Sequence, residues 1–69
     1  MKKKATIVRD NVSTFARPSV NSIVVNKYDK KGKELTLYPI EEGWYELRPV
    51  DHDGVMNTEF IQAKHIKII

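Results

Sequence analysis

A histidine between two aspartates, a few serines and a pair of glutamates are the residues of this chain whose types could carry out chemistry. His52 lies between Asp51 and Asp53, and His and Asp are common metal ligands. Adjacent residues on a strand or turn point in different directions, so these three side chains rarely converge on one ion. We therefore expect no metal site and no cofactor.

Nucleophilic and carboxylate catalysis are equally poorly supported. Ser13, Ser19 and Ser22 have no sequence-local base with motif character, and the sequence contains no phosphate-binding glycine loop. Glu41 and Glu42 are adjacent in an expected turn, where solvent should surround both carboxylates. The sequence therefore predicts that the protein is not an enzyme.

The length of 69 residues limits the chain to one domain with a modest core. A domain of this size buries only about 60% of the surface that its unfolded chain exposes. Because the chain has no cysteine, no disulfide can add to the stability, and the apolar strand faces must supply most of it. We expect a flexible basic N-terminus over residues 1–3 and a single domain over residues 4–69.

Twelve Lys and Arg residues against nine Asp and Glu residues give a net charge of +3. This excess favours anionic partners in general without selecting nucleic acid. Residues 5–8 form an apolar run shorter than the roughly 7–15 residues of a signal peptide, and no run approaches the ~18 residues of a membrane span. We expect no membrane insertion, and a cytoplasmic location if the chain is full length. A domain excised from a longer protein would instead belong to the cell envelope or the extracellular space.

The elements that must position any site are short runs of alternating apolar residues, separated by turns at intervals of roughly 8–12 residues. We expect strands at residues 6–9, 23–28, 35–38, 44–48, 55–56 and 65–69, with a hairpin turn at 51–54. Residues 10–22 are rich in Asn, Ser and Thr and are predicted to form a long loop. The pattern predicts an all-β fold of five to six short antiparallel strands, whose last strand pairs with the first. At most one helical turn is expected, near residues 58–63.

Three local signals then follow one another in order: Ala16-Arg17-Pro18-Ser19, Lys30-Lys31-Gly32-Lys33-Glu34-Leu35 and Gly43-Trp44-Tyr45-Glu46-Leu47-Arg48. In this order they resemble the bacterial SH3-like (SH3b) domain family, a small barrel found on cell-wall hydrolases and many envelope proteins. The resemblance covers nearly the whole length. The chain departs from the family in a longer early loop, and in Gly54-Val55-Met56 where the family has Gly-Trp-Val. The resemblance implies a small SH3-like barrel.

The resemblance also implies a function, the recognition of peptidoglycan or a cell-wall peptide by a non-catalytic binding module. A shallow groove between the long loop and the strand face would be lined by aromatic side chains and a few polar groups. Tyr38 is expected to be exposed, and Trp44 should point away from its inward neighbours on the same strand. A structural alternative is that the Trp44 and Phe15 side chains cap the open ends of the barrel. The implied ligand-binding residues are Phe15, Arg17, Tyr38 and Trp44.

Two further classes of function remain open. An intracellular protein-interaction module, such as a phage or mobile-element factor, would use the same aromatic face or a strand edge such as residues 66–69. A nucleic-acid-binding barrel would combine the lysines of residues 27–33 with Tyr38 or Trp44 as a stacking platform. Glu42 and Glu46 beside Trp44 would repel phosphates. A cell-wall peptide or peptidoglycan therefore ranks first as partner, a protein second and nucleic acid last.

Overall fold

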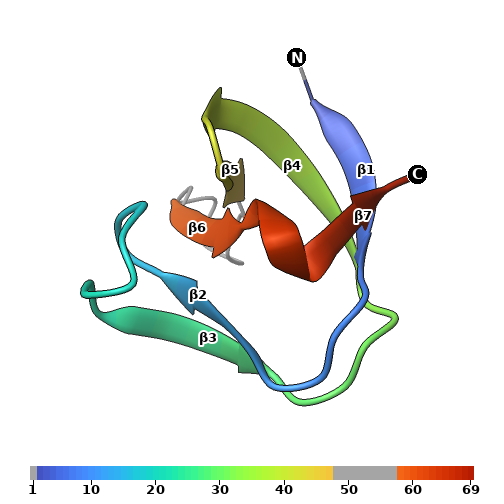
Figure 1. Cartoon of the computed structure of the whole chain (residues 1–69), viewed down its shortest axis with the longest axis horizontal. Coiled ribbons are helices and arrows are strands. Elements are labelled where there is room, and N and C mark those ends of the chain that lie inside the picture. Colours follow the sequence, from blue (N-terminus) through green and yellow to red (C-terminus); the bar gives the residue numbers. More distant parts are fainter. Residues whose placement is uncertain (1, 48–57) are drawn as a thin grey trace, which may run out of the picture.

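The computed structural model describes residues 2–47 and 58–69, and within them the protein is all-β (Figure 1). The predicted fold class is confirmed, with seven antiparallel strands where five to six were expected. The one helical element in these residues is a single 3-10 turn, η1. The elements are β1 (Lys3–Ile7), β2 (Val12–Phe15), β3 (Val24–Tyr28), β4 (Glu34–Glu41), β5 (Trp44–Leu47), β6 (Glu59–Gln62), η1 (Ala63–His65) and β7 (Ile66–Ile68).

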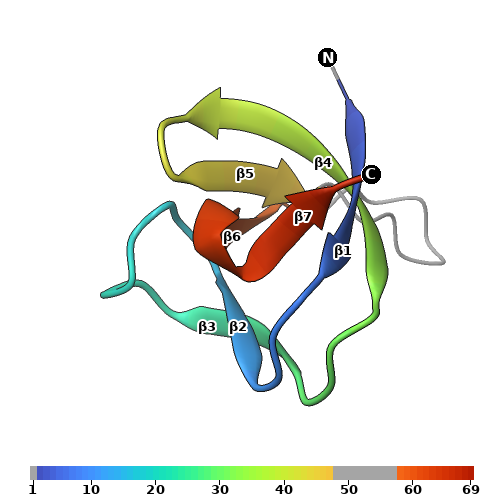
Figure 2. The ribbon, with the colours of Figure 1, turned by 45° about the vertical axis from the view of Figure 1, so that its right-hand side comes forward.

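All seven strands belong to one curled sheet in the order β3-β2-β6-β5-β4-β1-β7. The eight-residue strand β4 pairs with a strand along each of its edges. Its Leu37 lies opposite Lys3 of β1 on one side and opposite Leu47 of β5 on the other. From β6, the turn η1 carries the chain across the molecule to β7, which pairs with β1 (Figure 2). The predicted pairing of the last strand with the first is therefore confirmed.

The hydrophobic core is small and draws on every strand except β3 and β7 for its fully buried residues. Partly buried side chains from β3, β4, β5 and β7 pack against it, among them Tyr45, whose predicted inward direction is confirmed. Among the described residues, none belongs to a helix with the length and apolar character needed to span a membrane. The buried core residues are Ala5, Ile7, Val12, Leu37, Leu47 and Ile61.

Two glycines allow the tight turns that connect the strands around the site. Gly32 has φ of +105° in the turn before β4, and Gly43 has φ of +85° in the turn between β4 and β5. Both values lie in a region that side chains with a Cβ atom rarely adopt. The Gly32 N–H donates to the carbonyl of Ile7 at 2.7 Å, and the Gly43 carbonyl accepts from the N–H of Ala63 at 2.8 Å. Each turn is thus attached to a distant part of the chain.

Two sequence predictions differ from the structure in detail. Residues 10–22 contain strand β2, in which Val12 and Thr14 are fully buried because they pair with β3 and face the core. Residues 59–62 form strand β6, and the helical turn lies just after them, at Ala63–His65. The expected hairpin at 51–54, the strand at 55–56 and the Asp51-His52-Asp53 cluster lie outside the described residues.

Candidate functional site

Strand register places three of the four sequence-predicted site residues on one face of the sheet. Phe15 of β2 lies opposite Phe60 of β6, Phe60 lies opposite Glu46 of β5, and Glu46 lies opposite Tyr38 of β4. Residues directly opposite in antiparallel strands share a face, so these four form a row across the sheet. Trp44 is two residues before Glu46 and shares its face. We call these five residues the aromatic face.

Phe15 and Trp44 are in direct contact within the aromatic face. Their ring centroids are 5.9 Å apart and the ring planes cross at 76°, which is an edge-to-face arrangement. Aromatic pairs of this geometry contribute roughly 0.5–1.5 kcal/mol beyond the area that they bury. Both side chains are half-buried, so part of each ring is accessible at the surface. The pair is therefore both a packing element and an available contact surface.

Tyr38 and Arg17 lie farther from this pair. Tyr38 is half-buried rather than exposed as the sequence predicted, and Glu46 and Phe60 separate it from Phe15 along the row. Arg17 is exposed in the loop between β2 and β3, two residues after Phe15. The structure therefore brings Phe15 and Trp44 together, and it places Tyr38 at the far end of the same face and Arg17 in the adjoining loop.

Phe60 joins the aromatic face without having been predicted there. A helical turn was expected near residues 58–63, whereas in the structure Phe60 and Gln62 alternate along β6 with the buried Ile61. Gln62 lies opposite Trp44, and its Oε1 atom is 2.9 Å from Nε2 of His65. Residues 59–62 read Glu-Phe-Ile-Gln and do not alternate between polar and apolar types, so the sequence carried no signal for Phe60 or Gln62 at these positions.

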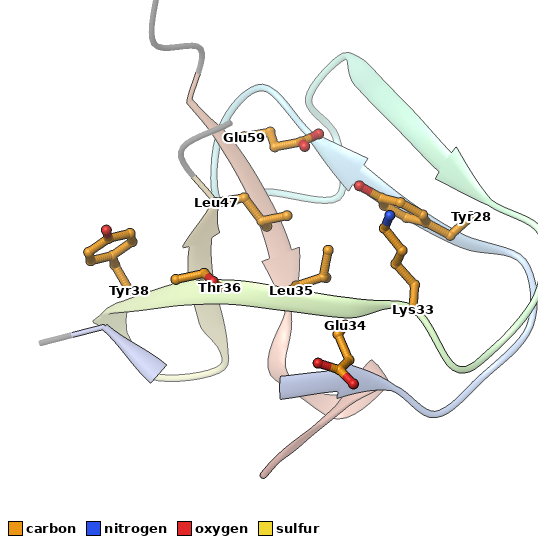
Figure 3. Close-up of a pocket in the computed structure, with 8 residues that line it drawn as sticks. All are labelled: Tyr28, Lys33, Glu34, Leu35, Thr36, Tyr38, Leu47 and Glu59. Atoms are coloured by element: carbon orange, nitrogen blue, oxygen red, sulfur yellow. The ribbon is translucent and has the colours of Figure 1, made fainter. Parts of the chain in front are cut away.

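A cavity of about 360 Å³ lies beside the first residues of β4, on the opposite side of this strand from β1 (Figure 3). Leu35 and Leu47 point into it, and the hydroxyl of Tyr28 and the carboxylate of Glu59 point toward each other across it. Lys33 reaches the same space from the turn before β4. The lining residues are Tyr28, Lys33, Glu34, Leu35, Thr36, Tyr38, Leu47 and Glu59.

Glu59 is the buried charged residue of this cavity, with only 2% of its surface exposed. The hydroxyl of Thr14 donates to Glu59 Oε2 at 2.5 Å, and Nδ2 of Asn26 donates to the same oxygen at 3.1 Å. The backbone N–H of Asn26 donates in turn to Thr14 Oγ1 at 3.1 Å. These bonds replace part of the hydration that the carboxylate loses on burial. The buried position of Glu59 was not predicted from the sequence, because a glutamate that faces a core is rare.

The environment of the same cavity changes the pKa of Tyr28, which is one of its lining residues. Burial raises the pKa of Tyr28 above its usual value of 10.0, and the nearby Glu59 carboxylate raises this pKa further. Both effects disfavour a second negative charge beside Glu59. The Tyr28 phenol therefore stays neutral, and its hydroxyl faces the Glu59 carboxylate across the cavity.

His65 lies at the end of η1, next to the aromatic face. Burial lowers the pKa of His65 below its usual value of 6.5, and the positive charges of Lys64 and Arg9 lower it further. Its Nδ1 atom is buried without a hydrogen-bond partner. The neutral imidazole is therefore favoured, and its contact with Gln62 helps to orient the amide group opposite Trp44.

The two surfaces differ in chemistry: the aromatic face is broad and mainly apolar, whereas the cavity has a charged group at its base. In the part of the chain that the structure describes, no three His, Cys, Asp or Glu side chains gather closely enough to hold a metal ion. Comparison of this chain with protein-family models, with curated proteins and with solved structures finds no match.

Proposed function

We propose that this protein is a non-catalytic binding module that takes a cell-wall peptide, or peptidoglycan carrying one, on its aromatic face. The observation that carries the proposal is the edge-to-face contact of Phe15 and Trp44 on a sheet face that also presents Phe60 and Tyr38. Rigid aromatic side chains supply contact area at a low entropic cost. The resemblance of the three ordered sequence signals to bacterial SH3-like domains supports the same ligand class.

The shape of the aromatic face favours an extended ligand with small side chains. A broad aromatic surface contacts a glycine-rich backbone or the face of a sugar ring closely, because no ligand side chain holds the two apart. The rings of Phe15 and Trp44 are half-buried and fixed by each other, so little side-chain freedom is lost on binding. The polar groups of Gln62 and Glu46 lie among the rings and can set the register of the ligand.

The location of the Glu46 carboxylate favours a peptide ligand over nucleic acid. Glu46 lies between Phe60 and Tyr38 in the row across the sheet. A carboxylate at the centre of a stacking surface repels the phosphate backbone of a bound strand. The exposed lysines at positions 30 and 31 lie in the turn between β3 and β4, in a different part of the fold from β5 and β6.

The test is retention of the purified protein on isolated cell-wall sacculi. We expect saturable retention of the native chain, and loss of at least about tenfold in affinity in Trp44→Ala and Phe15→Ala, the range for truncating a central aromatic anchor. Ile23→Ser is the matched control, because Ile23 is 78% exposed in the loop before β3 and lies outside the aromatic face. Circular dichroism melts identify any variant that does not fold.

Retention that is equal in the native chain and in folded Trp44→Ala contradicts the proposal, as does absence of retention of the native chain. Phe15→Leu and Trp44→Leu serve as milder changes if the alanine variants unfold, since each keeps an apolar side chain while removing the ring. Selective loss of retention in the ring variants, with the Ile23→Ser control unaffected, supports the aromatic face as the binding surface.

A second candidate function, binding of a protein partner, is favoured by the exposed apolar edge of the sheet. β3 is at one end of the strand order, and its Val24 and Val25 are 51% and 46% exposed beside the still more exposed Ile23. An edge strand of this kind can pair with a strand from another protein. For this function the variants exchange roles: Ile23→Ser and Val25→Ser should abolish capture of a specific partner that Trp44→Ala still binds.

A further inference from the structure

The buried carboxylate of Glu59 is not needed by the aromatic face, because it lies on the other face of β6. Glu59 and Ile61 face the core side, whereas Phe60 and Gln62 face outward. A buried carboxylate is costly unless it is compensated by hydrogen bonds or by a cation. The hydrogen bonds from Thr14 and Asn26 supply only part of that compensation.

One oxygen of Glu59 retains the capacity to accept a further hydrogen bond. Oε2 accepts from Thr14 at 2.5 Å and from Asn26 at 3.1 Å, whereas Oε1 has only a long contact of 3.4 Å to Asn26 Nδ2. An ionised carboxylate has about four acceptor sites. A single donor fits this arrangement better than a bidentate guanidinium, which requires both oxygens at once.

The walls of the cavity suit an alkyl chain that ends in a positive charge. Leu35 and Leu47 supply apolar surface, along which the methylene groups of a lysine-like chain can lie (Figure 3). The ring of Tyr28 offers an aromatic surface near the Glu59 carboxylate, where an ammonium group gains a further attraction. The volume of about 360 Å³ is at the lower end for small-molecule sites.

We propose that the Glu59 cavity is a second binding site, specific for a primary ammonium group on an alkyl chain such as the side chain of a lysine in a ligand. The protein's own Lys33, which lines the mouth of the cavity, competes with that ligand for Glu59. The cavity shares Tyr38 with the aromatic face, but Glu59, Tyr28 and Leu47 do not belong to that face, so the inference can be tested separately from the proposed function.

Titration of the isotope-labelled protein with small blocked amino acids, followed by NMR, tests the site. The probes are the Nα-acetyl N-methylamides of lysine, norleucine and arginine, which share a backbone and differ in the side-chain end. We expect the lysine derivative to shift the amide signals of Glu59, Tyr28 and Leu47, with a dissociation constant on the order of millimolar for so small a ligand. The norleucine and arginine derivatives should bind at least about fivefold more weakly.

Two variants locate the interaction at Glu59 and Lys33. Glu59→Gln keeps the shape of the side chain and removes its charge, and it should weaken binding of the lysine derivative by at least about tenfold. Lys33→Met should strengthen binding severalfold by removing the competing ammonium. Lys30→Met is the matched control, since it removes the same charge from the exposed turn without touching the cavity.

Several outcomes overturn the inference. Equal binding of the norleucine derivative would show a purely apolar cavity, and equal binding of the arginine derivative would remove the preference for ammonium. Absence of shifts in the native protein excludes the site outright. Equal effects of Lys33→Met and Lys30→Met contradict the role of Lys33. If Glu59→Gln does not fold, the comparison of the three derivatives on the native protein still decides the question.

Discussion

The four residues of strand β6 are divided between two faces of the sheet that have different roles. On the outward face, Phe60 and Gln62 contribute to a broad aromatic surface whose side chains support one another. On the inward face, Ile61 completes the core while Glu59 places a carboxylate at the base of a cavity. One short strand therefore links an aromatic contact surface to a pocket with a buried carboxylate, and the energetic roles of its residues should differ sharply.

The largest expected difference is between Ile61 and its neighbour Phe60. Ile61 is completely buried, so Ile61→Ala should lower the free energy of unfolding by about 2–5 kcal/mol. That loss is comparable to the entire stability of roughly 3–10 kcal/mol that a domain of 69 residues can have. Phe60→Ala should cost only about 1 kcal/mol, because Phe60 is half-buried on the outward face. Urea denaturation measures both, and equal losses would contradict the assignment of the two faces.

A double-mutant cycle on Glu59 and Thr14 should show the next largest effect. Glu59→Leu removes the acceptor of the Asn26 amide and leaves the Thr14 hydroxyl with only a 3.4 Å contact to the Asn26 carbonyl, so it should cost about 1–3 kcal/mol of unfolding free energy. Adding Thr14→Val removes one orphaned group, and the double variant should be destabilised by clearly less than the sum of the single variants. Strict additivity would show that the Thr14–Glu59 bond has no energetic weight.

On the outward face, the coupling between Phe15 and Trp44 should be smaller. A cycle of Phe15→Leu and Trp44→Leu should yield a coupling energy of about 0.5–1.5 kcal/mol from the edge-to-face contact. The matched cycle of Phe15→Leu and Tyr38→Leu should yield less than about 0.5 kcal/mol, because Phe60 and Glu46 separate these two residues. Equal coupling in the two cycles would contradict the arrangement of the aromatic face.

The smallest effect concerns the pH dependence from His65. Because the folded pKa of His65 lies below its usual 6.5, the unfolded chain takes up a proton at a higher pH than the folded protein does. The contribution of His65 to stability is therefore complete above pH 6.5 and is lost as the pH falls toward the folded pKa. Thermal melts at several pH values should show a slope in this window that is reduced in His65→Gln.

The strand pattern of the aromatic face could be predicted from sequence because alternation alone decides it. Tyr45 and Leu47 are apolar and alternate with Trp44 and Glu46, so the outward direction of Trp44 followed from a simple period of two. That Phe15 lies beside Trp44 could not be predicted, since the contact depends on β6 pairing with both β2 and β5. Sequence spacing carries no information on such a pairing.

The cavity was not predicted because its residues look unremarkable in the sequence. Thr14 lies in the polar stretch of residues 10–22 that is typical of a loop, and it is buried beside Glu59 only through the pairing of β2 with β3. Glu59 lies in a segment too short to distinguish a strand from a helical turn by periodicity. Tertiary pairing, rather than local preference, determines both.

The pairing of β1 with β7 brings the two ends of the described chain together. The N–H of Ile69 donates to the carbonyl of Lys4 at 2.9 Å, and both ends emerge on the same side of the molecule (Figures 1 and 2). A module built in this way can be placed inside a surface loop of another protein, because its entry and exit points need little separation. Joining residues 2 and 69 by a short linker should likewise allow new termini elsewhere, with both binding surfaces unchanged.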